Sequence, residues 1–217
     1  MIRAVFALWL IAMPVWATQD GWPALYNVSG VAVDDVLNVR AAPDVTSEII
    51  GSLDPDAADV EVIRPDPALA WGLVNTGEGT GWVSLAFLAR QPGQWEEQVP
   101  VVHQCFGTEP FWSLDIEGPA VLLNTPEGPP EAGLVAEQLV ADGRRDRFVS
   151  RGTLLSSEAG ALDLALHLRT QACGDGMSDR AYGIAADLLV TDPDDSDGTR
   201  PARLRAGCCS LTSAPEP

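Results

Sequence analysis

Seven residues of the chain decide its fold class: Leu162-Asp163-Leu164-Ala165-Leu166-His167-Leu168. Leucine occupies every second position, and the residues between the leucines are acidic Asp163, small Ala165 and polar His167. Because successive side chains of a β-strand point to opposite faces, this strict alternation predicts a strand with one buried face. The segments around it are also short and turn-separated, so we expect an all-β protein.

Further strands are expected on both sides of this segment. In the second half of the chain they are predicted at residues 111–116, 120–123, 147–150, 181–190 and 202–209. Residues 134–140 fit a short helix or a strand, and their pattern does not decide between the two. Roughly six to eight antiparallel strands in a segment of this size predict a barrel or a sandwich.

The first part of the chain is also rich in short strands, which are predicted at residues 37–40, 60–63, 71–74 and 81–83. Their length and spacing, without a helical stretch, favour a small barrel. The composition changes at Gln91-Pro92-Gly93-Gln94. We therefore expect one domain at residues 18–92 and a second, disulfide-bearing β domain at residues 93–217.

One pattern runs from Leu37-Asn38-Val39-Arg40-Ala41-Ala42-Pro43 through Ile50-Gly51-Ser52-Leu53 to Gly81-Trp82-Val83. This part of the chain, about a third of its length, resembles the bacterial Src-homology-3-like (SH3b) domain. The resemblance implies a small barrel that binds peptides, often of the cell wall, and performs no chemistry. Trp71 and Trp82 either fill its core or line a shallow groove with Arg40 at the rim.

Three motifs mark the second half: Cys105-Phe106-Gly107-Thr108-Glu109-Pro110-Phe111-Trp112, Cys173-Gly174-Asp175-Gly176-Met177-Ser178-Asp179-Arg180-Ala181-Tyr182, and Gly207-Cys208-Cys209. Together they resemble a family of uncharacterised bacterial envelope proteins that is often compared with the META-domain heat-shock lipoproteins. That resemblance implies fold and location more than function.

Within these motifs, several side chains are candidates for binding, namely Glu109, Trp112, Asp175, Asp179 and Tyr182. A structural interpretation competes with this one. Asp175 and Ser178 would cap backbone groups in a tight turn, and Arg180 would pair with Glu109 or Asp179.

The four cysteines, Cys105, Cys173, Cys208 and Cys209, predict two disulfides in an oxidising compartment. Cys208 and Cys209 are adjacent, so each should prefer a distant partner. We expect Cys173 to pair with Cys208 and Cys105 with Cys209, although the exchanged pairing stays open. In this expectation Cys105 precedes the first strand of its domain and Cys173 lies in a loop. A thiolate metal site that includes His103 is the competing hypothesis, without a Cys-x-x-Cys pair to support it.

The first residues have the order of a secretory signal peptide. A short positive start, Met1-Ile2-Arg3, precedes an uncharged apolar run at residues 4–13 and a cleavage position after Ala17. The run is shorter than the roughly 20 residues that span a bilayer, and no later stretch is apolar enough to do so. We therefore expect residues 1–17 to be a signal peptide and the protein to be periplasmic or secreted by a bacterium.

The charge is strongly acidic, with 31 acidic against 13 basic residues and a formal net charge of −18. Such a field repels nucleic acid and anionic lipid headgroups, which excludes both as expected partners. The acidic run Asp192-Pro193-Asp194-Asp195-Ser196-Asp197-Gly198 departs from the EF-hand loop, because its sixth residue is Asp197 and its twelfth is Arg203. A solvated hairpin turn is expected there.

No catalytic set is visible in the sequence. The only histidines are His103 and His167, no strand–turn–helix motif frames a serine nucleophile, and no glycine loop is placed to hold phosphate. We expect a non-catalytic envelope protein without a cofactor that binds a peptide, peptidoglycan or a protein partner. The alternatives are an accessory or inhibitor of a cell-wall hydrolase, and a thiolate metal-binding protein.

Overall fold

The computed structural model describes residues 21–94, 98–157, 159–195, 198 and 202–213. The expected signal peptide at residues 1–17 lies outside this part of the chain. The described residues form β-strands in two units, with one short 3₁₀ helix, η1, at Leu85–Phe87. The prediction of an all-β protein is confirmed. Within the described residues, no helix has the length and apolar character needed to cross a membrane.

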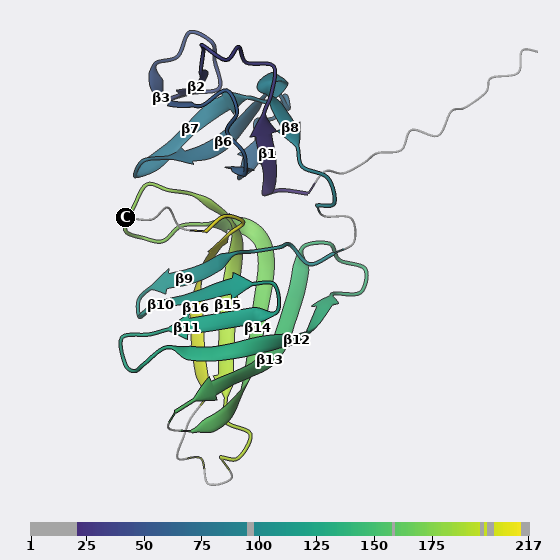
Figure 1. Cartoon of the computed structure of the whole chain (residues 1–217), viewed down its shortest axis with the longest axis vertical. Coiled ribbons are helices and arrows are strands. Elements are labelled where there is room, and N and C mark those ends of the chain that lie inside the picture. The colour runs from purple at the N-terminus through teal and green to yellow at the C-terminus, as the bar shows by residue number, and fades with distance from the viewer. Residues whose placement is uncertain (1–20, 95–97, 158, 196–197, 199–201, 214–217) are drawn as a thin grey trace, which may run out of the picture.

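The first unit consists of two antiparallel sheets of short strands (Figure 1). The smaller sheet has the order β4-β1-β8, formed by Val60–Val62, Ala24–Val28 and Leu88–Arg90. The larger sheet has the order β3-β2-β7-β6-β5, formed by Ile49–Leu53, Leu37–Arg40, Gly79–Ser84, Trp71–Thr76 and Arg64–Pro65. The strands expected at 37–40, 71–74 and 81–83 fall within these elements, and the one expected at 60–63 matches β4 except for Ile63, which lies between β4 and β5.

One apolar core lies between the two sheets. Val39, Val62 and Val83 are completely buried in it. Gly81 lies directly against Val39, so that any Cβ at this position would collide with the valine side chain. The close approach of β2 and β7 therefore requires a residue without a side chain.

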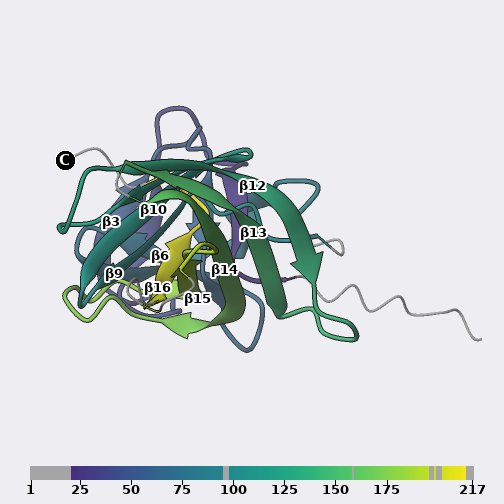
Figure 2. The same ribbon diagram turned by 90° about the horizontal axis from the view of Figure 1, so that it is seen from below.

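The second unit is a closed barrel of eight antiparallel strands (Figure 2). They are β9 to β16 in chain order: Gln104–Thr108, Phe111–Glu117, Ala120–Asn124, Glu131–Val140, Arg147–Ser156, Gly160–Cys173, Tyr182–Thr191 and Arg203–Ser210. Each strand pairs with its chain neighbour, and β16 pairs with β9 to close the ring. Of the two expected architectures, the structure has the barrel, and the undecided residues 134–140 belong to strand β12.

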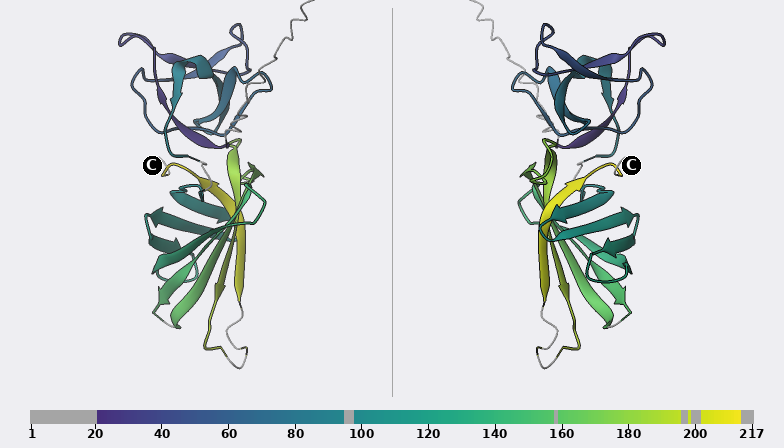
Figure 3. Two further views of the ribbon diagram at one scale, coloured as in Figure 1. Left: turned by 90° about the vertical axis from the view of Figure 1, so that its right-hand side faces the viewer. Right: turned by 90° about the vertical axis from the view of Figure 1, so that its left-hand side faces the viewer.

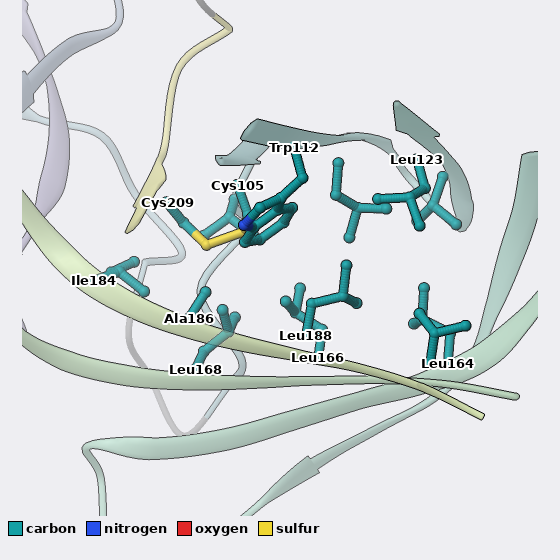
Figure 4. Close-up of a cluster of buried hydrophobic side chains, with 14 of the residues drawn as sticks. Cys105, Trp112, Leu123, Leu164, Leu166, Leu168, Ile184, Ala186, Leu188 and Cys209 are labelled. Atoms are coloured by element: carbon teal, nitrogen blue, oxygen red, sulfur yellow. A yellow bond between two sulfur atoms is a disulfide. The ribbon is translucent and has the colours of Figure 1, made fainter. Parts of the chain in front are cut away.

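The inner surface of the barrel is apolar and well packed (Figure 4). Leu162, Leu164, Leu166 and Leu168 all face inward and are at most 4% exposed. Trp112 lies among them, and its indole N–H donates to the Ala206 carbonyl oxygen at 3.2 Å. This tryptophan is a core residue of the barrel, so it offers no surface to a partner.

The disulfides join Cys105 to Cys209 and Cys173 to Cys208. Cys105 lies within strand β9 rather than before the first strand, and Cys173 is the last residue of β14 rather than part of a loop. The sequence hides β9 because its residues alternate poorly. No cysteine is free, so the hypothesis of a thiolate metal site is wrong for this oxidised form.

The first unit sits on one end of the barrel (Figure 3). The Asn75 side-chain amide donates to the Ala181 carbonyl at 2.9 Å and accepts from the Ala181 N–H at 3.0 Å. Nearby, the Asp179 N–H donates to the Glu78 carbonyl at 3.0 Å. The loop that joins β14 to β15 is therefore fixed against the β6–β7 hairpin of the first unit.

Candidate functional site

Aromatic and cationic side chains share the outer face of the larger sheet in the first unit. The register places Arg40 and Leu73 on either side of Trp82, and Arg64 opposite Leu73. Val39, which precedes Arg40, and Val83, which follows Trp82, point into the core. Because side chains alternate between the two faces of a strand, four side chains project from the outer face: Arg40, Arg64, Trp71 and Trp82. We call these four residues the Arg–Trp face.

Local contacts hold this face in place. The Arg64 guanidinium lies over the Trp82 ring, 5.0 Å from its centroid, in a cation–π arrangement. The Arg40 Nη1 donates to the Ser47 carbonyl at 2.7 Å. Trp71 and Trp82 are both half-buried, which leaves part of each ring open to solvent.

The position of Trp71 depends on Asp66, which sequence reasoning missed. Its carboxylate accepts the N–H groups of Trp71 at 2.7 Å, Ala70 at 2.7 Å and Ala68 at 3.1 Å. These hydrogen bonds, led by that from Trp71, hold the pKa of Asp66 below its ordinary value. The sequence Pro65-Asp66-Pro67 is a turn signal that could have revealed this role.

A cleft of about 540 Å³ between the two units begins beside Arg64. Its lining includes Trp22, Ile63, Phe148 and Tyr182. Trp22 stacks on Tyr26 with 5.7 Å between the ring centroids. Because Arg64 contacts Trp82 and also lines this cleft, the Arg–Trp face continues into an aromatic cleft.

Asp175 has the structural role that competed with binding. Its Oδ1 accepts from the N–H groups of Met177 and Ser178, both at 2.9 Å, and its Oδ2 accepts from the Ser178 hydroxyl at 2.7 Å. Burial alone would raise the pKa of Asp175, but the hydrogen bonds from Ser178 and Met177 hold it below its ordinary value. The carboxylate caps a tight turn.

The other candidates of the second unit do not converge on one site. Glu109 is exposed, whereas Tyr182 is buried and meets Phe106 edge to face at 5.0 Å. Asp179 is exposed and contacts the first unit through its backbone. Arg180 forms an ion pair with neither Glu109 nor Asp179 among the described residues; it lies instead in a second cleft, with Glu61 of the first unit. Sequence reasoning missed Glu61.

The acidic run after β15 begins as a turn. The Asp192 Oδ1 accepts from the Asp194 N–H at 2.9 Å, while residues 196 and 197 lie outside the described part of the chain. In the part of the chain that the structure describes, no group of three or more histidine, cysteine or acidic side chains is placed to hold a metal ion.

Protein-family models, curated proteins and solved structures give no match to this chain. The described residues offer two candidate binding features: the Arg–Trp face with its adjoining cleft, and the second cleft, which contains Glu61 and Arg180.

Proposed function

We propose that the protein is a non-catalytic binding protein of the bacterial periplasm or cell exterior. Its first unit is an SH3-like domain that docks on a carboxylate-bearing peptide such as the peptide of the cell wall. The observation that carries this proposal is the Arg–Trp face. The two disulfides indicate an oxidising compartment, and the sequence resemblance to SH3b domains supports the peptide class.

The chemistry of the face fits such a ligand. Tryptophan offers a large apolar surface that loses little conformational entropy on binding, and it is enriched among residues that dominate interfaces. Arginine presents a planar fork of N–H donors that matches a carboxylate. In a chain with a net charge of −18, two outward arginines beside two tryptophans provide cationic groups that can pair with an anionic ligand.

The adjoining cleft gives the ligand a second place of contact. A peptide whose carboxylate is bound at Arg64 could extend its next side chain between Trp22 and Tyr182, which both line the cleft of about 540 Å³. Such a cleft is large enough for side-chain-sized groups. The proposal therefore includes an extended ligand that runs from Trp82 towards the barrel.

The test is co-sedimentation of the purified protein with insoluble cell wall, followed by titration with soluble wall peptides. Trp82→Ala and Arg64→Gln are each expected to weaken binding about tenfold or more, the range of an interface hot spot. Phe87→Ala is the matched control, because Phe87 is an exposed aromatic residue of the same unit outside this face.

Equal binding by wild type, Trp82→Ala and Phe87→Ala would refute docking through this face. Sedimentation that occurs only when a cell-wall hydrolase is added would also contradict direct docking, and it would favour the accessory role instead.

A further inference from the structure

A second cleft, of about 460 Å³, lies between strand β4 of the first unit and the end of the barrel. Its lining comes from both units and includes Glu61, Asn75, Gln104, Phe106, Arg180 and Tyr182. This cleft contains no member of the Arg–Trp face. It shares only Tyr182 with the cleft beside Arg64.

Glu61 presents an unsatisfied acceptor in this cleft. Its Oε2 accepts from the Ser210 hydroxyl at 2.5 Å and from the Leu211 N–H at 3.1 Å. Its Oε1 is buried and has no hydrogen-bond partner among the residues that the structure describes. One carboxylate oxygen thus joins the two units, and the described residues place no hydrogen-bond donor on the other.

Arg180 presents the complementary unsatisfied donor. Its Nε is buried, and no described residue accepts a hydrogen bond from it. Burial raises the pKa of Glu61, and the positive charge of Arg180 is among the interactions that partly oppose this; both side chains line the same cleft. They nevertheless form no ion pair within 4.0 Å of each other. Buried polar atoms are nearly always satisfied, so a bound group that supplies one donor and one acceptor would complete the site.

We propose that this cleft binds a small zwitterion, an α-amino acid or a dipeptide, between Glu61 and Arg180. The ligand ammonium would donate to the Glu61 Oε1, and the ligand carboxylate would accept from the Arg180 Nε–H. Opposite charges then face each other at both ends of the ligand. Binding requires no part of the Arg–Trp face, and it does not rest on the proposed docking function.

The remaining walls suit the rest of such a ligand. Phe106 and Tyr182 form an edge-to-face aromatic pair, 5.0 Å between centroids, that provides an apolar surface. Leu53 and Val60 of the first unit also line the cleft. An aliphatic side chain therefore has an apolar place to pack, and we expect leucine to bind more tightly than glycine.

The first experiment is isothermal titration calorimetry of the wild-type protein with L-leucine and with L-leucylglycine. Two analogues of leucine separate the charges: 4-methylpentanoate lacks the ammonium, and 3-methylbutylamine lacks the carboxylate. Each analogue is expected to bind at least tenfold more weakly than leucine. If leucylglycine binds more tightly than leucine, the ligand is a dipeptide. If leucine binds more tightly than leucylglycine, the ligand is a free amino acid.

Variants then locate the site. Glu61→Gln keeps the size and the acceptor for Ser210, and Arg180→Gln removes the guanidinium; each is expected to lower the affinity for the tighter zwitterion at least tenfold. Glu48→Gln and Arg151→Gln are matched controls at exposed positions and should bind as wild type. Trp82→Ala should also bind as wild type, which separates this site from the docking face.

Absence of saturable binding by any zwitterion to the folded wild type would overturn the proposal. Equal affinity for leucine and its two single-charge analogues would do the same. The analogues need no substitution, so the proposal remains testable even if Glu61→Gln or Arg180→Gln fails to fold.

Discussion

Glu61 in strand β4 and Ser210 at the end of strand β16 are joined by a hydrogen bond of 2.5 Å between the carboxylate and the hydroxyl. The bond links residues 149 positions apart and crosses from the first unit to the second. Its acceptor is a carboxylate whose other oxygen, Oε1, is buried. The contact between the units should therefore respond to pH.

Burial raises the pKa of Glu61 above its ordinary value of 4.5, and the hydrogen bonds from Ser210 and Leu211 and the charge of Arg180 only partly oppose this. Between the ordinary and the raised pKa, the folded protein holds a proton that the unfolded chain has released. The free energy of unfolding therefore falls as the pH rises through this window. Glu61→Gln removes this titrating group. The free energy of unfolding of the variant minus that of the wild type, measured by urea unfolding, should therefore increase from pH 4.5 to pH 8. A constant difference, like that expected for exposed Glu48→Gln, would contradict this.

The two disulfides should differ in their contribution to stability. Cys105–Cys209 spans 104 residues and Cys173–Cys208 spans 35, for which the chain-entropy model gives about 5 and about 4 kcal/mol. Cys105 and Cys209 are also completely buried. The double variant Cys105→Ala/Cys209→Ala should therefore lose more free energy of unfolding than Cys173→Ala/Cys208→Ala. Mass spectrometry with an alkylating reagent provides the control, because wild type should be modified only after reduction.

Arg205 is a charged side chain that points into the barrel. Its side chain is 8% exposed, and among the described residues it forms one ion pair, a 3.6 Å contact with Glu127, which is 59% exposed. The Nε and Nη1 are buried, and no residue in the described part of the chain accepts a hydrogen bond from them. Apolar replacement of a poorly paired buried charge is often stabilising, so Arg205→Met should raise the free energy of unfolding by about 1–4 kcal/mol.

Urea unfolding of Arg205→Met and of Arg151→Met would measure this. Arg151 lies on the outer surface in a similar ion pair, and its replacement should change stability by less than about 0.5 kcal/mol. A loss of stability in Arg205→Met alone would show that its burial is favourable, contrary to this prediction.

Gly183 fixes how closely the two units approach. A Cβ at this position would lie 2.6 Å from the Pro23 Cδ and would meet two further atoms of the same ring. Gly183→Ala should therefore push the units apart, weaken the Asn75–Ala181 contact and increase proteolysis between the units. Gly174→Ala is the control, because the same addition there meets nothing within 4 Å. Equal protease sensitivity of the two variants would argue against this role for Gly183.

The sequence was informative wherever burial follows a local pattern. The leucines from Leu162 to Leu168 predicted a strand because one face of β14 is buried along its whole length. Residues 134–140 did not decide between helix and strand, because most of their side chains in β12 are exposed and a register shift follows Val135. Strand β9 escaped prediction because its glycine and polar residues hide the alternation.

The candidate sites were less accessible to prediction. Trp82 and Arg40 lie opposite each other because β2 pairs with β7, two strands that are not consecutive in the chain. Trp112 is buried because Gly107 and Gly207, a hundred residues apart, both lack side chains where its ring lies. Glu61 and Arg180 belong to different units and line the same cleft, and no local pattern in either segment carries that information.

The closure of the barrel between β9 and β16 has a consequence for how the chain folds. Every other neighbouring pair of strands in the barrel is consecutive in the chain, so those hairpins can form as each segment is synthesised. The β9–β16 pair must wait for the last strand, and until then the nascent sheet has two unpaired edges that can recruit other chains. Cys105 and Cys209 face each other at that join. The disulfide between them stabilises the closed barrel once β16 has paired with β9. In a secretion host that lacks a thiol oxidase, the protein should therefore accumulate as aggregates rather than as monomers with an unclosed barrel.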